Sequence, residues 1–258
     1  MNKPIVAISL KMYFTRKQTL AYCRRLADLL NAAALPLDKV TMAVLPDYLT
    51  VEQAGQALLS TDVHLGIQDV CDQDRGPFTG EVSPRDAFDL GVTVAEVGHE
   101  ERRRLYGEDD ELIGRKVRAC WRNGLTPLLC VGELSNHGPE AAADYCLKQI
   151  EMGLGENPDL PAWIAYEPVW AVGASRPAPV EYVQEVCSII KNKLGPQCHN
   201  LSLIYGGAAA PGLLTELWPT VDGVFLGRFA HDPAVFLEVV KEAWRLISQD
   251  SEVQNGQS

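Results

Sequence analysis

The sequence predicts an α/β protein folded as a single (β/α)₈ barrel. Three observations lead to this fold class: short apolar runs alternate with amphipathic stretches, eight such units follow one another, and the length of 258 residues suits one barrel. Strict alternation of strand and helix implies a parallel sheet with helical crossovers. An open doubly wound sheet is the alternative. Its fingerprints, G-x-G-x-x-G after the first strand and a Walker A sequence, do not occur.

The expected strands are short and almost continuously apolar, which is typical of a parallel sheet buried on both faces. They are Pro4–Leu10, Val40–Leu45, Val63–Gln68, Val92–Val97, Pro127–Val131, Trp163–Glu167, Leu203–Tyr205 and Val224–Leu226.

The expected helices carry apolar residues three and four positions apart, as an amphipathic helix should. The clearest are Thr15–Ala33, Asp110–Arg122, Val180–Leu194, Pro211–Trp218 and Asp232–Ile247. We expect residues 1–248 to form one barrel domain. The polar residues 249–258 are expected to be a disordered tail.

The net charge of −11 argues against nucleic acid and anionic membranes as partners. Such a surface also repels phosphorylated metabolites, so an anionic substrate needs a local device such as backbone N–H groups or a well-placed Lys. The first ten residues show no secretory signal, and we expect a soluble, cytoplasmic protein. Seven scattered cysteines without a C-x-x-C pair argue against a disulfide framework and a thiolate zinc site.

In such barrels the chemistry lies on loops that follow the strands, and three ionisable residues occupy these positions. Lys11 leaves the first strand and is either an anion ligand or an ordinary surface Lys. His99 follows the fourth strand, where a helix N-terminus favours a neutral imidazole; a structural His is the alternative. Glu167 ends the sixth strand, where a carboxylate is a natural general base.

Loops after three strands have the composition of lids and phosphate sites. The segment Pro168–Pro177 is rich in Gly, Ala, Ser and Pro and carries one Trp, which suits a hinged lid or merely an exposed loop. The seventh strand ends in Tyr205-Gly206-Gly207-Ala208, and the eighth in Gly227-Arg228. Barrels commonly hold phosphate on these two loops.

Taken together, these segments resemble the triosephosphate isomerase family from the first strand to the last. The residues that carry the resemblance are Lys11-Met12, Phe78–Ser83, Gly98-His99, Glu101-Arg102-Arg103, Tyr106-Gly107-Glu108, Asp110–Gly114, Cys130–Glu133, Ala165–Gly173, Tyr205-Gly206-Gly207 and Val221-Asp222-Gly223.

The resemblance implies roles for the matching positions. Glu167 would abstract a proton next to a carbonyl, and His99 would be the neutral electrophile that polarises this carbonyl. Lys11 would stabilise the enediolate, and the N–H of Gly173 would bind phosphate once the lid closes. Because His99 and Lys11 supply the electrophile, the resemblance implies neither a metal nor a cofactor.

The resemblance also implies supporting residues and a homodimer. Glu101 matches a position beside the active site, Glu133 and Trp170 match a pair linked to lid closure, and Tyr205 opens the phosphate loop. The Phe78–Ser83 loop resembles one that inserts into a neighbouring subunit. Thr79 would then lie close to the partner's Lys11 and the partner's His99.

Several residues depart from the family pattern around the ligand. Before Lys11, Ser9 stands where the family has Asn and Leu10 where it has Trp. After His99, Glu100 replaces a Ser. On the phosphate loops, Ala208 replaces a phosphate-binding Ser, and Arg228 replaces the second Gly of a Gly-Gly pair that begins at Gly227. Such changes resemble those of the tetrulose-phosphate isomerases, which interconvert L-erythrulose 1-phosphate and D-erythrulose 4-phosphate in four-carbon polyol breakdown. Ser9 would make room for a fourth carbon, and Arg228 would bind a repositioned phosphate.

Two other functions stay open at this point. The chain could be a triosephosphate isomerase with tolerated substitutions, acting on glyceraldehyde 3-phosphate and dihydroxyacetone phosphate. It could also be a barrel that binds a phosphorylated sugar without turning it over. Retention of Lys11, His99 and Glu167 argues against the second alternative.

Overall fold

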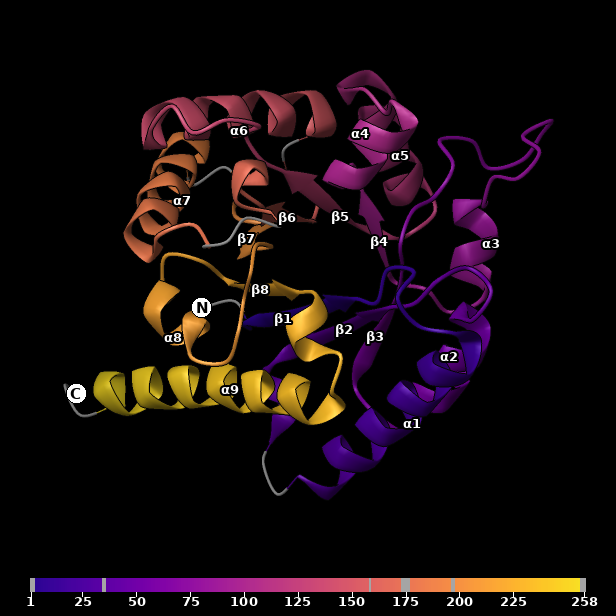
Figure 1. The fold of residues 1–258 in the computed structure, drawn as a ribbon, viewed down its shortest axis with the longest axis horizontal. Helices are drawn as coiled ribbons and strands as arrows, with labels where there is room; N and C mark the ends of the chain where they lie inside the picture. The colour runs from indigo at the N-terminus through magenta and orange to yellow at the C-terminus, as the bar shows by residue number, and fades with distance from the viewer. Residues whose placement is uncertain (1–2, 34–35, 158, 173–176, 196–197, 256–258) are drawn as a thin grey trace.

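The structure is a closed barrel of eight parallel strands surrounded by helices (Figure 1). It is a computed structural model that describes residues 3–33, 36–157, 159–172, 177–195 and 198–255. Each strand pairs with the next in the sequence, and β8 pairs with β1 to close the barrel. The strands are β1 Ile5–Ser9, β2 Thr41–Leu45, β3 Val63–Ile67, β4 Val94–Val97, β5 Thr126–Val131, β6 Ala162–Tyr166, β7 Leu201–Tyr205 and β8 Gly223–Leu226.

The predicted fold class is confirmed, and every predicted strand lies within two residues of its observed ends. The agreement is close because most strand residues are buried on both faces of the sheet, so that the apolar run marks the strand directly.

The helices cover the outside of the barrel (Figure 1). They are α1 Arg16–Ala32, α2 Val51–Leu58, α3 Pro84–Asp89, α4 Glu100–Tyr106, α5 Asp110–Arg122, α6 Pro139–Leu154, α7 Val180–Leu194, α8 Leu213–Leu217 and α9 Pro233–Asn255. The backbone of α9 stays helical to Asn255, beyond the predicted end at Ile247 and through most of the segment that we expected to be disordered. No individual boundaries were predicted for α2, α3, α4 and α6. Of these, α3 and α4 have six and seven residues and are too short to show a periodic pattern.

Two apolar layers hold the barrel together. Val6 and Ile8 of β1 face outward and pack with the helices, while Ile5 and Ala7 face the interior of the barrel. This alternation follows from the period of two along a strand. The next inward position on β1 is Ser9, at the carboxyl end of the strand, so the interior becomes polar where the mouth of the barrel begins.

All seven cysteines are free thiols, and only Cys198 is not buried. Within the part of the chain that the structure describes, no helix is long and apolar enough to cross a membrane.

Candidate active site

A cavity of about 320 Å³ opens at the carboxyl ends of the strands. Nine residues singled out from the sequence line it. They are Ser9, Lys11, His99, Glu101, Glu167, Tyr205, Ala208, Gly227 and Arg228. Segments more than 200 residues apart in the chain therefore meet at one site, at the end of the barrel where the sequence predicts it.

His99 is fixed as a neutral imidazole that points its proton into the cavity. It is the N-cap of α4, and the turn into the helix is made by Gly98, whose φ is +73°. The Nδ1 atom of His99 accepts a hydrogen bond from the backbone N–H of Glu101 at 3.1 Å. The ring proton is therefore on Nε2, which lies 3.5 Å from Oε2 of Glu167. Burial, assisted by the charge of Lys11, lowers the pKa of His99 to about 4.

Glu167 is a buried carboxyl group directly after β6. Its backbone N–H donates to the carbonyl of Val131 at 2.9 Å. The chain passes so close to Gly132 that a Cβ atom there would lie 1.8 Å from the Glu167 carbonyl oxygen, so only glycine fits. Burial raises the pKa of Glu167 to about 7; Lys11 opposes this rise, while Glu100 adds to it. The carboxyl group is therefore a stronger base than an exposed glutamate.

Lys11 brings a positive charge to the same cavity. It is the only described residue besides glycines with a positive φ, at +47°. The Gln68 side-chain amide stabilises this turn by donating to the carbonyls of Lys11 at 3.1 Å and of Leu45 at 3.0 Å. The Lys11 ammonium group donates to Oε1 of Glu101 at 3.0 Å. Burial alone would lower the pKa of Lys11, but this hydrogen bond and the surrounding acidic charges raise it.

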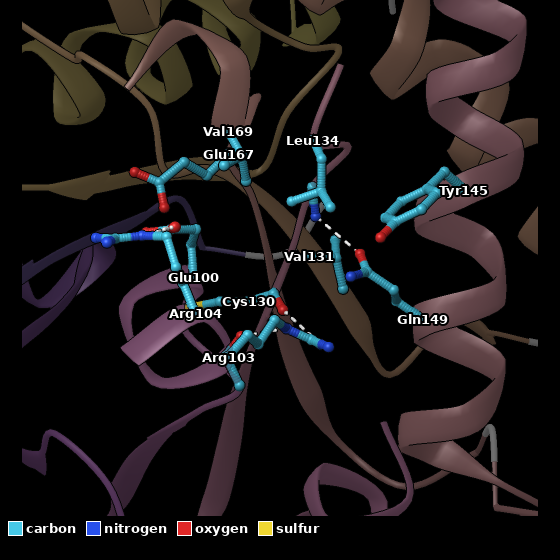
Figure 2. Close-up of a pocket in the computed structure, with 12 residues that line it drawn as sticks. Glu100, Arg103, Arg104, Cys130, Val131, Leu134, Tyr145, Gln149, Glu167 and Val169 are labelled. Carbon is cyan, nitrogen blue, oxygen red and sulfur yellow. Dashed lines mark hydrogen bonds and ion pairs between the residues drawn. The ribbon is translucent and has the colours of Figure 1, made fainter. Parts of the chain in front are cut away.

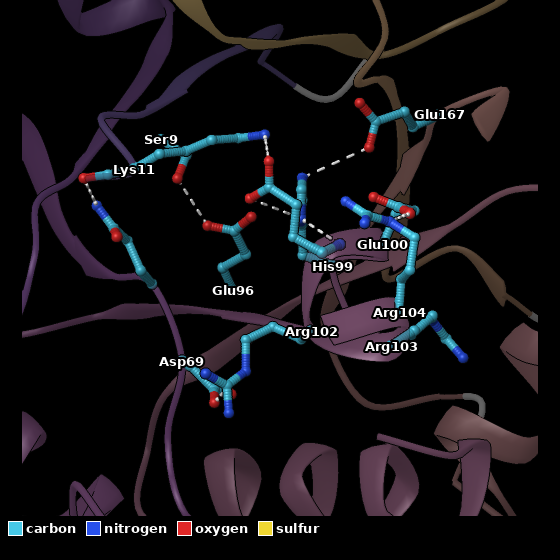
Figure 3. A network of polar contacts seen from close by, with 12 residues as sticks. Ser9, Lys11, Asp69, Glu96, His99, Glu100, Arg102, Arg103, Arg104 and Glu167 are labelled. Carbon is cyan, nitrogen blue, oxygen red and sulfur yellow. Dashed lines mark hydrogen bonds and ion pairs between the residues drawn. The ribbon is translucent and has the colours of Figure 1, made fainter. Parts of the chain in front are cut away.

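A base, a neutral hydrogen-bond donor and a cation thus converge on one place (Figure 3). A carboxylate of raised pKa can remove a proton from a carbon next to a carbonyl. The Nε2–H of His99 can donate to the carbonyl oxygen, and the Lys11 ammonium group can stabilise the charge that develops there.

The opposite rim of the cavity is built from loops after β7 and β8. A Cβ atom at Gly207 would lie 2.2 Å from the Tyr205 hydroxyl, so this loop turns too tightly for a side chain. Arg228 begins a short 3₁₀ turn, and its guanidinium carbon lies 5.9 Å from the centre of the Tyr13 ring. In the described part of the chain Arg228 forms no ion pair with a carboxylate, so its charge is available to an anion in the cavity.

Glu133 and Trp170 lie outside the cavity but make contact with each other, as the resemblance implies. The Oε1 atom of Glu133 accepts hydrogen bonds from Trp170 Nε1 at 2.6 Å, from the Tyr182 hydroxyl at 2.9 Å and from the Tyr166 hydroxyl at 3.2 Å. The first residues of the expected lid are thereby tied to β6 and α7.

Two predicted residues cannot be assigned to the cavity. Gly173 lies outside the described residues. Thr79 is exposed on the segment between β3 and α3, which projects from the barrel in Figure 1 and does not line the cavity.

The sequence analysis missed further residues at the site. Tyr13 and Phe229 also line the cavity, and Glu96 lies next to Ser9. The available signal for Glu96 was an acidic residue within an otherwise apolar strand.

Glu100, which the sequence singled out as a departure from the family pattern, lines a second cavity of about 340 Å³ that Glu167 also lines (Figure 2). There it accepts a hydrogen bond from Arg104 at 2.6 Å.

The fold and the geometry of the site define an isomerase of the (β/α)₈-barrel class that acts on sugar phosphates. The chain belongs to the triosephosphate isomerase family, because the model of that family, "Triosephosphate isomerase", matches residues 4–243.

Individual relatives fall into two groups. The chain is 43% identical to an L-erythrulose-1-phosphate isomerase of Pectobacterium atrosepticum, over 96% of this chain and 98% of the relative. It is 31% identical to a triosephosphate isomerase of Citrifermentans bemidjiense, over 93% of this chain and 99% of the relative. The crystal structure of triosephosphate isomerase from Bartonella henselae superposes with a TM-score of 0.78 at 29% identity, covering 94% of this chain and 99% of that chain.

Proposed function

We propose that this enzyme interconverts L-erythrulose 1-phosphate and D-erythrulose 4-phosphate. The observation that carries the proposal is the meeting of Glu167, the neutral His99 and Lys11 in one cavity, which supports carbonyl transfer through an enediolate. The four-carbon substrate is supported by the relative of 43% identity and by a second L-erythrulose-1-phosphate isomerase, from Rhizobium etli, at 36% identity over 95% of this chain.

The proposed reaction moves the ketone by one carbon. Glu167 removes the proton from C3 of L-erythrulose 1-phosphate, and the electron pair of that C–H bond forms the C2–C3 double bond of an enediolate. His99 donates a hydrogen bond to the oxygen on C2, and Lys11 stabilises its negative charge. Return of the carbon-bound proton to C2, with transfer of the hydroxyl proton from the C3 oxygen to the C2 oxygen by way of His99, gives the ketone at C3. No atom is gained or lost in the cycle.

Phosphate binding is assigned to the rim formed by Ala208, Gly227 and Arg228. Because Ala208 has no hydroxyl group, the Arg228 guanidinium group would supply the hydrogen bonds that hold the phosphate there. The N–H of Gly173 would add to them when the lid closes, with Glu133 and Trp170 as the anchor of the lid.

The proposed assembly is a homodimer in which the Phe78–Ser83 loop of one subunit enters its neighbour. The Phe78 side chain is 41% exposed in the single chain, and Thr79 is exposed beside it. An exposed aromatic side chain on a projecting loop supports such an interface. The seven free thiols support the cytoplasm as the compartment.

The test is a comparison of kcat/KM for L-erythrulose 1-phosphate and for glyceraldehyde 3-phosphate. We expect the four-carbon substrate to be preferred by at least about tenfold, because one matched group in a binding site typically contributes this much. Comparable or higher kcat/KM on the triose would make the protein a triosephosphate isomerase. Binding of these sugars without turnover would identify a non-catalytic barrel instead.

A further inference from the structure

A buried acid lies in the wall of the barrel where the reaction centre begins. Glu96 is on β4, two residues after Val94, whose side chain packs in the interior of the barrel, so Glu96 faces the interior too. Only 3% of its surface is exposed. Ser9 of β1, also inward-facing, donates a hydrogen bond from Oγ to Oε2 of Glu96 at 2.9 Å (Figure 3).

A carboxyl group buried at this place destabilises the folded protein, and this cost indicates that the group has a function. Burying a polar group without a full set of hydrogen bonds destabilises the folded state, and an apolar side chain would fill the same space. In the described part of the chain, Ser9 is the only hydrogen-bond partner of the Glu96 side chain. Burial raises the pKa of Glu96 to about 8, so near neutral pH the group holds a proton that it can donate.

The position of the pair in the barrel indicates which part of a substrate it can reach. In the ring of eight strands β4 lies opposite β8, and Arg228 follows β8 by two residues. Lys11, His99 and Glu167 line the same cavity as Arg228, and the charges of Lys11 and Glu167 act on Glu96. Glu96 does not line the cavity but its partner Ser9 does, so a sugar phosphate anchored at Arg228 can reach the pair through the Ser9 hydroxyl group.

We infer that Ser9, oriented by Glu96, binds the terminal hydroxymethyl group of a four-carbon sugar phosphate. The inference rests on the proposed function and names the contact that selects the substrate. In L-erythrulose 1-phosphate this group is attached to C3, the carbon that loses its proton. A three-carbon substrate ends at that carbon and leaves the pair without a partner. The small side chain of Ser9 leaves room for the extra carbon, and Ser9 Oγ, held by its hydrogen bond to Glu96, can accept a hydrogen bond from the substrate hydroxyl group.

The decisive probe is 4-deoxy-L-erythrulose 1-phosphate, which has a methyl group in place of the hydroxymethyl group. We expect the wild-type enzyme to show a kcat/KM on the order of 10²-fold or more below that for the parent substrate, because sites built to bind a hydroxyl group reject analogues that lack it. In Glu96→Leu most of this discrimination should disappear. Ser9→Ala should reduce it in the same direction, since it removes the hydroxyl group that Glu96 orients toward the cavity.

Glyceraldehyde 3-phosphate is the internal control for these variants. The inference requires that Glu96→Leu lower kcat/KM much more for L-erythrulose 1-phosphate than for the triose. An equal loss on both substrates would assign Glu96 a general role and overturn the inference. So would equal kcat/KM of the wild-type enzyme for the parent and deoxy compounds, a result that does not depend on whether any variant folds.

The two proposals fail in different ways. The proposed function fails when the wild-type enzyme prefers glyceraldehyde 3-phosphate. The inference about Ser9 and Glu96 fails when the enzyme prefers the four-carbon substrate but does not distinguish it from its deoxy analogue.

Discussion

The two sides of the active-site cavity are built differently. On the side of β4 and β6, His99 and Glu167 are almost enclosed, and burial moves the pKa of each toward the value that its proposed role needs. On the side of β7 and β8, Ala208 and Arg228 are exposed on short glycine-containing loops. Enclosed groups are suited to proton transfer and exposed loops to holding a phosphate, so substitutions on the first side should affect kcat and those on the second KM.

The largest effect is expected for Glu167→Gln. An amide cannot remove a proton from carbon, so kcat for L-erythrulose 1-phosphate should fall by about 10³-fold or more. Competitive inhibition by inorganic phosphate should change little, since the phosphate rim is untouched. The matched control is Glu238→Gln, at an exposed glutamate of α9, which should keep wild-type kcat. Normal turnover by Glu167→Gln would remove Glu167 from the reaction.

A smaller effect is expected on the other side of the cavity, for Arg228→Ala. Hydrogen bonds to charged groups contribute about 1.5–3 kcal/mol, so KM should rise roughly 10- to 100-fold while kcat changes much less. Arg25→Ala, at an exposed arginine of α1, is the matched control. Steady-state kinetics with an unchanged KM would show that Arg228 does not bind the phosphate.

The pH dependence of kcat/KM separates the two titrating residues of the enclosed side. Glu167 must be ionised to act as a base, so kcat/KM should fall as the pH decreases through about 7. His99, with a pKa near 4, should stay neutral over this range and add no second slope.

Glu100→Ser tests the origin of this pKa. Because the charge of Glu100 helps to raise the pKa of Glu167, its removal should move the decline of kcat/KM to lower pH. A decline that stays in place or moves to higher pH would mean that Glu100 does not influence the base. The measurement is a pH profile of kcat/KM for both proteins.

The positions of the residues on the enclosed side could be predicted from the sequence. The strand ends that carry Lys11, His99 and Glu167 follow from apolar runs that are buried on both faces, and the residues at those ends carry the family motifs. A neutral His99 was also expected, although from the helix N-terminus; its pKa is lowered chiefly by burial and then by the charge of Lys11. Burial depends on the whole fold, so its extent cannot be obtained from a local segment.

Glu96 shows what the sequence could not provide. One acidic residue in Val92–Val97 did not alter the prediction of a strand. Its contact with Ser9 could not be predicted, because the two residues are 87 positions apart in the chain. Only closure of the barrel brings β1 and β4, which are not neighbours in the sheet, around one narrow interior where their side chains meet. Contacts of this kind need the register of the barrel, which no local pattern specifies.

The smallest expected effect concerns stability and comes from the same Glu96. Its pKa of about 8 in the folded protein exceeds the usual value of about 4.3. Between these two pH values the folded state holds a proton that the unfolded state has released, so the contribution of Glu96 to stability decreases as the pH rises. Glu96→Leu removes this dependence. The Tm of the variant relative to the wild type should therefore increase by a few degrees Celsius between about pH 5 and pH 8.5.

Calorimetry at several pH values measures this difference. Glu167 also has a raised pKa, but it is present in both proteins and its contribution to first order cancels from the comparison. Leucine at this position should pack in the interior layer beside Leu45 and Cys130. A Tm difference that is constant with pH would mean that Glu96 titrates alike in the folded and unfolded states. The carboxyl group would then be ionised at neutral pH and could accept, but not donate, a hydrogen bond with Ser9.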